Sequence, residues 1–203
     1  MSLEYIKQKY NLNHYEISNV DRIDLVRLFA ELKFKVIVEV GVCAGAYTKI
    51  ICTYNPEAKV YGIDPFIPYK EYNDYKLKST IDDYYEKAKN VAKEMKNLTL
   101  IRKFSMDALE DFPDESIDAV YIDANHEEPF ISDDIREWTK KVKKGGIVSG
   151  HDYVRPAKNH RVAVKQAVDR YVKENNKTLI LWGLEAKVPS LRRESARSWM
   201  FVK

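Results

Sequence analysis

The sequence predicts an α/β fold in which helices cover both faces of a doubly wound, mostly parallel sheet of seven strands. First, short β-rich runs alternate with amphipathic segments through residues 35–175. Second, these runs are almost continuously apolar, as strands covered on both faces are. Third, no helical segment separates the last two runs, 178–183 and 198–203, so we expect an antiparallel pair, with an antiparallel last strand, at one sheet edge.

The elements follow in order along the chain. The first 30 residues are expected to be helical, most clearly DRIDLVRLFAELK (21–33), whose apolar residues recur at the spacing of one helix face. Further helices are expected at 46–54, 79–96, 130–142 and 162–175. The earlier strands are expected at 35–40, 58–64, 98–103, 116–123 and 145–153.

Local signals set some of the boundaries. Ser79 or Thr80 is expected to cap the 79–96 helix. The pair Gly145-Gly146 is expected to end the 130–142 helix. The polar stretch between Gly183 and Ser198 is long for a loop in a compact domain, which is typical of a lid or a mobile segment.

Length and composition predict a single domain, 1–203, with an N-terminal helical segment (1–30) and a core from residue 35 onward. No apolar run approaches the roughly 20 residues needed to cross a bilayer. The N-terminus lacks the apolar segment of a signal peptide. The two cysteines, Cys43 and Cys52, are too few for a disulfide framework, so a cytoplasmic protein is expected. The net charge of +3 is spread among acids, which does not favour a nucleic-acid partner.

Four distinctive clusters follow expected strands, at the edge of the sheet where open α/β folds bind ligands. They are Glu39 to Gly45 (EVGVCAG), Gly62 to Phe66 (GIDPF), Asp123 to His126 (DANH) and Gly150 to Tyr153 (GHDY). Because the carboxyl ends of parallel strands meet at one edge, these clusters predict one shared site.

The first two clusters indicate the ligand. Gly41 and Gly45 allow close approach of the backbone to a ligand. Asp64, 19 residues after Gly45, is placed to accept hydrogen bonds from both hydroxyls of a ribose. A dinucleotide site would need a third glycine, and the Glu39 anion would repel a pyrophosphate. S-adenosylmethionine (SAM) carries a sulfonium, an amino group and a ribose but no phosphate, so it fits better.

Three segments together carry a family resemblance: VIVEVGVCAGAYT, VYGIDPF and SIDAVYIDANHEEPFISDDIREWTKKVKKGGIVSGHDY. They resemble the class I SAM-dependent methyltransferases, in particular the small-molecule O-methyltransferases related to the catechol and macrocin enzymes. The resemblance covers about residues 35–175, and SWMFVK is similar to the family's last strand. It implies a Rossmann-like fold and O-methylation of a small-molecule acceptor. The sequence leaves the oligomeric state open, homo-oligomers included.

The resemblance also implies roles for individual residues. Glu39, Gly41 and Gly45 would line the methionine part of the cofactor, Asp64 would bind the ribose, and Asp123 would lie beside the cofactor. The adenine contacts would come from residues just after the third strand. These are Ser105, Met106 and Asp107. One departure is Cys43, where many relatives carry a glycine.

At the reacting end an acceptor hydroxyl needs a base or a metal. In the catechol-type relatives, acids that match Asp123 and Asp152 bind the metal, which would be Mg²⁺ or another divalent cation. The asparagine that follows there is Tyr153 here. His126 stands where those relatives carry a catalytic lysine, and it is the first candidate base. His151 is the second.

Other residues have less specific interpretations. Tyr69, Tyr72 and Tyr75 are expected in a loop that walls the pocket or covers the cofactor. Tyr84 and Tyr85 are expected to serve the amphipathic packing of the 79–96 helix, and Trp138 is expected in the core. Surface positions are expected for His14, His160, Arg192 and Arg193.

Three other functions remain open from the sequence. One is a nicotinamide-dependent oxidoreductase, another is a non-catalytic protein that binds a nucleoside cofactor, and the third is an RNA methyltransferase. The missing third glycine opposes the first, and the scattered basic residues give little support to the last.

Overall fold

The computed structural model describes residues 2–10, 16–17, 20–69, 75, 77–154, 163–183 and 197–203. Its strands are β1 (Glu16–Ile17), β2 (Val36–Val40), β3 (Lys59–Ile63), β4 (Leu98–Ile101), β5 (Ile117–Ile122), β6 (Val142–Tyr153), β7 (Ile180–Trp182) and β8 (Arg197–Val202). Its helices are α1 (Ser2–Tyr10), α2 (Arg22–Glu31), α3 (Ala46–Tyr54), α4 (Lys78–Glu94), α5 (Ser105–Ala108), the 3₁₀ turn η2 (Leu109–Asp111), α6 (Phe130–Lys141) and α7 (Val164–Glu174).

The strands form one sheet in the order β1-β7-β8-β6-β5-β2-β3-β4. From β2 the chain runs through β3 to the β4 edge, and it then returns to β5 on the other side of β2. Strands β4, β3, β2, β5 and β6 are parallel, whereas β8 lies antiparallel between β6 and β7. The predicted doubly wound sheet with an antiparallel last strand is therefore confirmed, and β2 and β5 flank the point where the strand order reverses.

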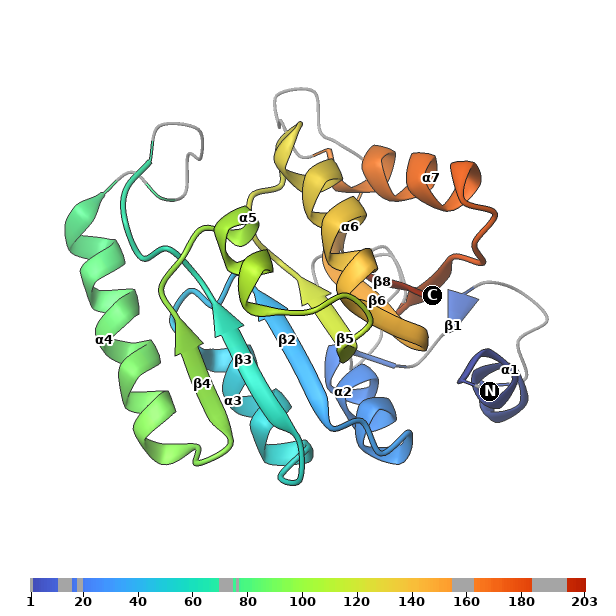
Figure 1. Ribbon diagram of the computed structural model, residues 1–203, viewed down its shortest axis with the longest axis horizontal. Coiled ribbons are helices and arrows are strands. Elements are labelled where there is room, and N and C mark those ends of the chain that lie inside the picture. The colour runs from blue at the N-terminus through green and yellow to red at the C-terminus, as the bar shows by residue number, and fades with distance from the viewer. Residues whose placement is uncertain are drawn as a thin grey trace, which may run out of the picture.

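Helices cover both faces of the sheet, as predicted (Figure 1). The α2 and α3 helices lie behind the sheet in this view, and α5, α6 and α7 lie in front of it. Alternate residues of β2 enter different cores: Ile37 packs with α2 and α3, whereas Val38 packs with α6 and α7. This double burial explains the continuous apolar runs of the central strands.

Two predicted boundaries are wrong. The α4 helix begins at Lys78 and not at a Ser79 or Thr80 cap, because the Leu77 carbonyl accepts the first amides, those of Thr80 and Ile81, at 3.1 and 3.2 Å. The α6 helix ends at Lys141, and β6 begins at once.

Gly145 and Gly146 therefore lie within β6 and do not end α6. A Cβ on Gly146 would lie 2.5 Å from the Asp118 carbonyl oxygen of β5. The glycine pair permits close strand packing at a register shift between the two strands.

The sequence interpretation also missed a strand in the N-terminal segment, which it described as helical. Glu16 and Ile17 form β1, which pairs in parallel with β7 and brings the observed sheet to eight strands in the described residues. Within that part of the chain, no helix has the length and apolar character required to cross a membrane.

Candidate active site

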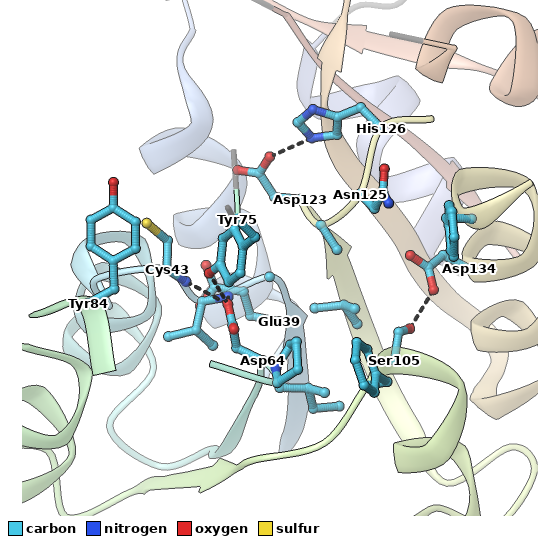
Figure 2. Close-up of a pocket in the computed structure, with 18 of the residues that line it drawn as sticks. Glu39, Cys43, Asp64, Tyr75, Tyr84, Ser105, Asp123, Asn125, His126 and Asp134 are labelled. Atoms are coloured by element: carbon cyan, nitrogen blue, oxygen red, sulfur yellow. Dashed lines mark hydrogen bonds and ion pairs between the residues drawn. The ribbon is translucent and has the colours of Figure 1, made fainter. Parts of the chain in front are cut away.

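A cavity of about 770 Å³ opens at the carboxyl ends of the central strands. Its walls come from the ends of β2, β3 and β5, from the segment after β4 and from the start of α6 (Figure 2). The acids on these walls are Glu39, Asp64, Asp107, Asp123, Asp133 and Asp134. Among the described residues the walls include one arginine, Arg22, and no lysine. The cavity thus favours a cationic ligand over a phosphate.

Two glycines shape the turn after β2, because each lies close to the backbone of another segment. Gly41 has φ 95°, and a Cβ there would lie 2.1 Å from the Asp123 carbonyl oxygen, so Gly41 brings the ends of β2 and β5 together. Gly45, with φ 81°, precedes α3, and a Cβ there would meet Ala88 of α4. Gly41 lines the cavity, whereas Gly45 does not and instead permits helix packing.

Cys43 adopts a backbone conformation that favours glycine. Its φ of 51° lies in the left-handed region, which glycine adopts without strain. The thiol is exposed and lines the cavity beside Asp64.

Glu39 lies at the floor of the cavity and is 2% exposed. The Thr48 hydroxyl of α3 donates a hydrogen bond to its carboxyl group. Burial raises the pKa of Glu39 to about 8, and this effect exceeds the opposing effect of Thr48. A cation that reaches the floor would restore the carboxylate.

Asp64 follows β3, is also 2% exposed, and accepts four hydrogen bonds. Its Oδ2 receives the amides of Val42 and Cys43 at 3.1 and 3.0 Å and the Tyr75 hydroxyl at 2.7 Å. Its Oδ1 receives the Phe66 amide at 2.9 Å. Figure 2 shows Tyr75 directed at Asp64 from the cavity side. Burial nevertheless leaves the pKa of Asp64 raised above its usual value. Oδ2 thus carries three donors and Oδ1 one, so a ribose hydroxyl that approached Oδ2 would compete with the tyrosine hydroxyl.

The predicted adenine residues follow β4. Ser105, Met106 and Asp107 all line the cavity. Ser105 accepts a hydrogen bond from the Trp138 indole at 2.8 Å and donates its own proton to Asp134. Trp138 is fully buried in the core, as predicted.

At the predicted reacting end, Asp123 and His126, which follow β5, meet Asp152 near the end of β6. His126 Nε2 lies 3.3 Å from Asp123 Oδ1 and 3.3 Å from Asp152 Oδ2. Burial lowers the pKa of His126, but the Asp123 hydrogen bond and the two carboxylates together outweigh burial and leave it raised. Burial opposes ionisation of Asp152, yet its histidine neighbours leave its pKa lowered. The cluster is an imidazole held between two carboxyl groups.

The same cluster fits a divalent cation. Asp123, His126 and Asp152 each offer one ligand atom, and these atoms all lie within 4.8 Å of one another. Two carboxylates with one imidazole form a mixed oxygen and nitrogen donor set. Tyr153 does not join it, because its hydroxyl donates to Asp169 of α7 at 2.6 Å.

His151 occupies a different place from His126. Its Nδ1 lies 3.7 Å from Asp152 Oδ2, and the cavity walls do not include it. His126 does line the cavity. The geometry therefore favours His126 as the group that meets a substrate.

The tyrosines singled out in the sequence fall into two groups, those that line the cavity and those that pack elsewhere. Tyr69, Tyr75 and Tyr84 line the cavity, whereas Tyr85 packs on Phe66 with ring centroids 4.8 Å apart. The packing interpretation is thus supported for Tyr85, and Tyr84 lies at the cavity instead. Several predictions concern residues outside the described ones: Tyr72, His14, His160, Arg192, Arg193 and most of the 184–197 loop.

Sequence reasoning assigned no role to several cavity residues, among them Asn125 and Asp134. Asn125 is 4% exposed, and its side-chain oxygen accepts the Glu127 amide at 3.0 Å, which shapes the turn between Asp123 and His126. Asp134 is 3% exposed on α6. A signal existed for Asp134, because an acid stands on the helix face that Ile131, Ile135 and Trp138 bury.

The fold and this acid-lined cavity define an α/β protein that binds its ligand where the strand order reverses. A profile of the family described as "Methyltransferase domain" matches residues 38–153, more than half of the chain. The chain belongs to this family, which confirms the resemblance seen in its motifs. No curated protein matches the sequence.

Solved structures share the fold at low sequence identity. The O-methyltransferase from Bacillus cereus in complex with SAH is 15% identical with a TM-score of 0.65, and the match covers 100% of this chain and 90% of that one. The O-methyltransferase TomG from Streptomyces achromogenes, in complex with SAM, is 16% identical with a TM-score of 0.60 and coverages of 99% and 89%. Precorrin-6y C5,15-methyltransferase from Geobacter metallireducens is 12% identical with a TM-score of 0.61 and coverages of 89% and 88%.

Proposed function

We propose that this methyltransferase transfers the methyl group of SAM to an oxygen of a small-molecule acceptor. The main observation in support of the proposal is the hydrogen bonding of the glycine turn after β2. The amides of Val42 and Cys43, which would face a pyrophosphate in a dinucleotide site, both donate to the Asp64 carboxylate. A ligand at this turn meets a carboxyl group and not free amide donors, which opposes a pyrophosphate and supports SAM over NAD.

The rest of the cavity supports the same cofactor. Glu39 at the floor offers a carboxylate to the cationic methionine end, and Asp64 offers one to the ribose. The related structures from Bacillus cereus and Streptomyces achromogenes are described with SAH and SAM, and as O-methyltransferases. The cavity volume is within the range of small-molecule sites, which supports a small acceptor.

His126 is the base of this proposal. An acceptor hydroxyl donates its proton to the His126 imidazole as its oxygen attacks the methyl carbon. The C–O bond forms while the C–S bond breaks, and the sulfonium leaves as a neutral thioether. Asp123 and Asp152 stabilise the imidazolium that results. A protein that only bound the cofactor would not need this arrangement.

A divalent cation would be held by Asp123, Asp152 and His126. When bound, it would lower the pKa of the acceptor hydroxyl. His126 would then help to hold the ion, together with the two carboxylates. The nitrogen ligand admits manganese or zinc as well as magnesium.

We extend the proposal to the cellular location and the partners of the enzyme. Both cysteines are free thiols, which fits a reducing cytoplasm. The acidic cavity walls do not favour a nucleic-acid acceptor. Homo-oligomer formation stays a prediction.

Calorimetric titration with SAM tests the proposal, with NAD as the control ligand and with magnesium or chelator present. Micromolar binding of SAM and none of NAD is expected. D64N should weaken SAM binding at least tenfold, whereas D133N, an acid on the cavity wall paired with Arg136 at 2.6 Å, should not. Binding of NAD in place of SAM would overturn the proposal. An effect of magnesium would support the cation site.

A further inference from the structure

The α6 helix carries a buried acid that the proposed chemistry does not use. Asp134 lies on the inner face of the helix, between Ile131 and Trp138, and is 3% exposed. It also lines the cavity. A buried carboxyl group is costly unless its oxygens find donors, so its hydrogen bonds indicate its role.

One oxygen of Asp134 is fixed by a short chain of hydrogen bonds. The Trp138 indole N–H donates to Ser105 Oγ at 2.8 Å, and Ser105 donates its single proton to Asp134 Oδ1. Because the serine oxygen already accepts from the tryptophan, its proton is committed to the acid. This arrangement fixes the carboxyl group relative to the segment that follows β4.

The other oxygen, Oδ2, is directed into the cavity (Figure 2). Among the described residues, no hydrogen-bond donor other than Ser105 reaches the carboxyl group. Burial raises the pKa of Asp134 to about 7, and this outweighs the effect of Ser105. A donor that arrives from the cavity would complete the hydrogen bonding of this group.

The walls beside Asp134 are apolar. Phe104 and Met106 flank Ser105 in sequence, both line the cavity, and they are 38% and 37% exposed. Phe130, at the start of α6, is 36% exposed and lines it too. Apolar surfaces with one buried acceptor match a flat aromatic ring that carries a hydrogen-bond donor on its edge.

We propose that Asp134 accepts a hydrogen bond from the 6-amino group of the cofactor's adenine and thereby selects adenine over other purines. The inference rests on the proposed function, because it places the base of SAM beside Ser105. Guanine and hypoxanthine carry an oxygen at the 6-position, which would face the ionised Asp134 carboxylate with no proton between them. Adenine places an N–H there.

The experiment compares two ligands in two variants. The ligands are S-adenosylhomocysteine and its analogue with unsubstituted purine in place of adenine, which lacks only the 6-amino group. The variant D134N keeps a side-chain oxygen for Ser105 and turns an NH₂ donor toward the cavity. D133N is the matched control, since Asp133 neighbours Asp134 on the cavity wall but pairs with Arg136.

The wild type and D133N should bind S-adenosylhomocysteine about 10- to 100-fold more tightly than the purine analogue, as expected for a hydrogen bond to a charged group. In D134N the ratio should fall to about one or invert. A role of Asp134 in folding alone would weaken both ligands equally and leave the ratio unchanged, which would overturn the inference.

Two outcomes separate this inference from the proposed function. If the wild type binds S-adenosylhomocysteine but binds the purine analogue equally well, Asp134 does not select the amino group and the inference fails alone, even if D134N does not fold. If the wild type binds neither ligand, the proposed function fails and this inference fails with it.

Discussion

The two halves of the cavity differ in how firmly their acids are held. The first half is formed by β2, β3 and the segment after β4, together with the α6 residue Asp134 that meets this segment. Here Glu39, Asp64 and Asp134 are at most 3% exposed, and each accepts at least one hydrogen bond from the surrounding fold. In the second half, formed by the segment after β5 and the end of β6, the side chains of His126, Asp123 and Asp152 are 15%, 23% and 28% exposed. Their mutual contacts, at 3.3 Å, are long for charge-assisted hydrogen bonds.

This difference matches two tasks. A cofactor site works by presenting acceptors that are fixed before the ligand arrives. A reacting end must admit an acceptor and move a proton, so its groups need access and a freer geometry. The comparison predicts that substitutions in the first half change binding, and that substitutions in the second half change turnover.

The largest effect is expected at Gly41, which joins the two halves. G41A would place a Cβ 2.1 Å from the Asp123 carbonyl oxygen at a φ of 95°. Backbone strain and overpacking together should lower the free energy of unfolding by about 3–5 kcal/mol. Urea denaturation measures it. G145A is the control, because Gly145 has φ 80° but nothing within 4 Å of its added Cβ. If both variants lost the same free energy of unfolding, backbone strain alone would explain the effect. The close approach of Gly41 to Asp123 would then not link the two halves.

The second-largest effect is expected at His126, and it tests whether the second half acts in turnover and not in cofactor binding. H126A should lower turnover about 10²- to 10⁴-fold, the usual contribution of a general base, and change the dissociation constant of SAM by less than about twofold. The assay is release of S-adenosylhomocysteine with an acceptor found by screening catechols and sugar hydroxyls. H151A should cost less than about tenfold, since His151 is not on the cavity wall. A loss of SAM affinity in H126A as large as the loss of turnover would break the comparison.

The sequence was most informative about the first half, for a physical reason. A strand that ends in an acid and a glycine turn constrains the backbone locally, so Glu39, Gly41 and Asp64 could be placed from spacing alone. Asp123 and Asp152 could be brought together because β5 and β6 are neighbours in a doubly wound sheet.

The rest depends on packing between segments far apart in the chain. Asp134 meets Ser105 only because α6 crosses the segment after β4, and Tyr75 reaches Asp64 from a loop whose path no local pattern sets. The Gly145-Gly146 pair was misinterpreted for the same reason. Its role in strand packing becomes visible only when Asp118 of the neighbouring strand is placed against it.

A smaller effect tests the ionisation of Glu39 in the first half of the cavity, the half proposed to bind the cofactor (the cofactor half). Burial raises the pKa of Glu39 to about 8 from its ordinary value of 4.5. Without ligand, the stability that the neutral group contributes is complete below pH 4.5 and is lost as the pH rises through 8. Cationic SAM binds the ionised form, so its affinity should rise up to about tenfold per pH unit between pH 6 and 7 and level off above pH 8. Calorimetry across this range measures it.

E39Q is the matched variant, because its side chain has the same shape but does not titrate. It should abolish most of the pH dependence of both stability and SAM affinity. A wild-type affinity that stays flat between pH 6 and 8, or a slope that survives in E39Q, would mean that another group carries the proton.

The smallest effect is expected at Tyr75. It tests whether the cofactor half already has its final hydrogen bonds before the ligand binds. The Tyr75 hydroxyl holds Asp64 Oδ2 at 2.7 Å, where a ribose hydroxyl is proposed to bind. Y75F should lower the free energy of unfolding by about 1 kcal/mol, because a buried carboxylate loses a donor. It should also tighten SAM binding about 3- to 10-fold, because the ribose no longer competes with the tyrosine. Y84F is the control, since Tyr84 lines the same cavity. If Y75F instead weakens SAM binding, the tyrosine stays on Asp64 in the complex. Asp64 would then position the turn rather than the ribose, and the first half would be fixed even more firmly than the comparison assumes.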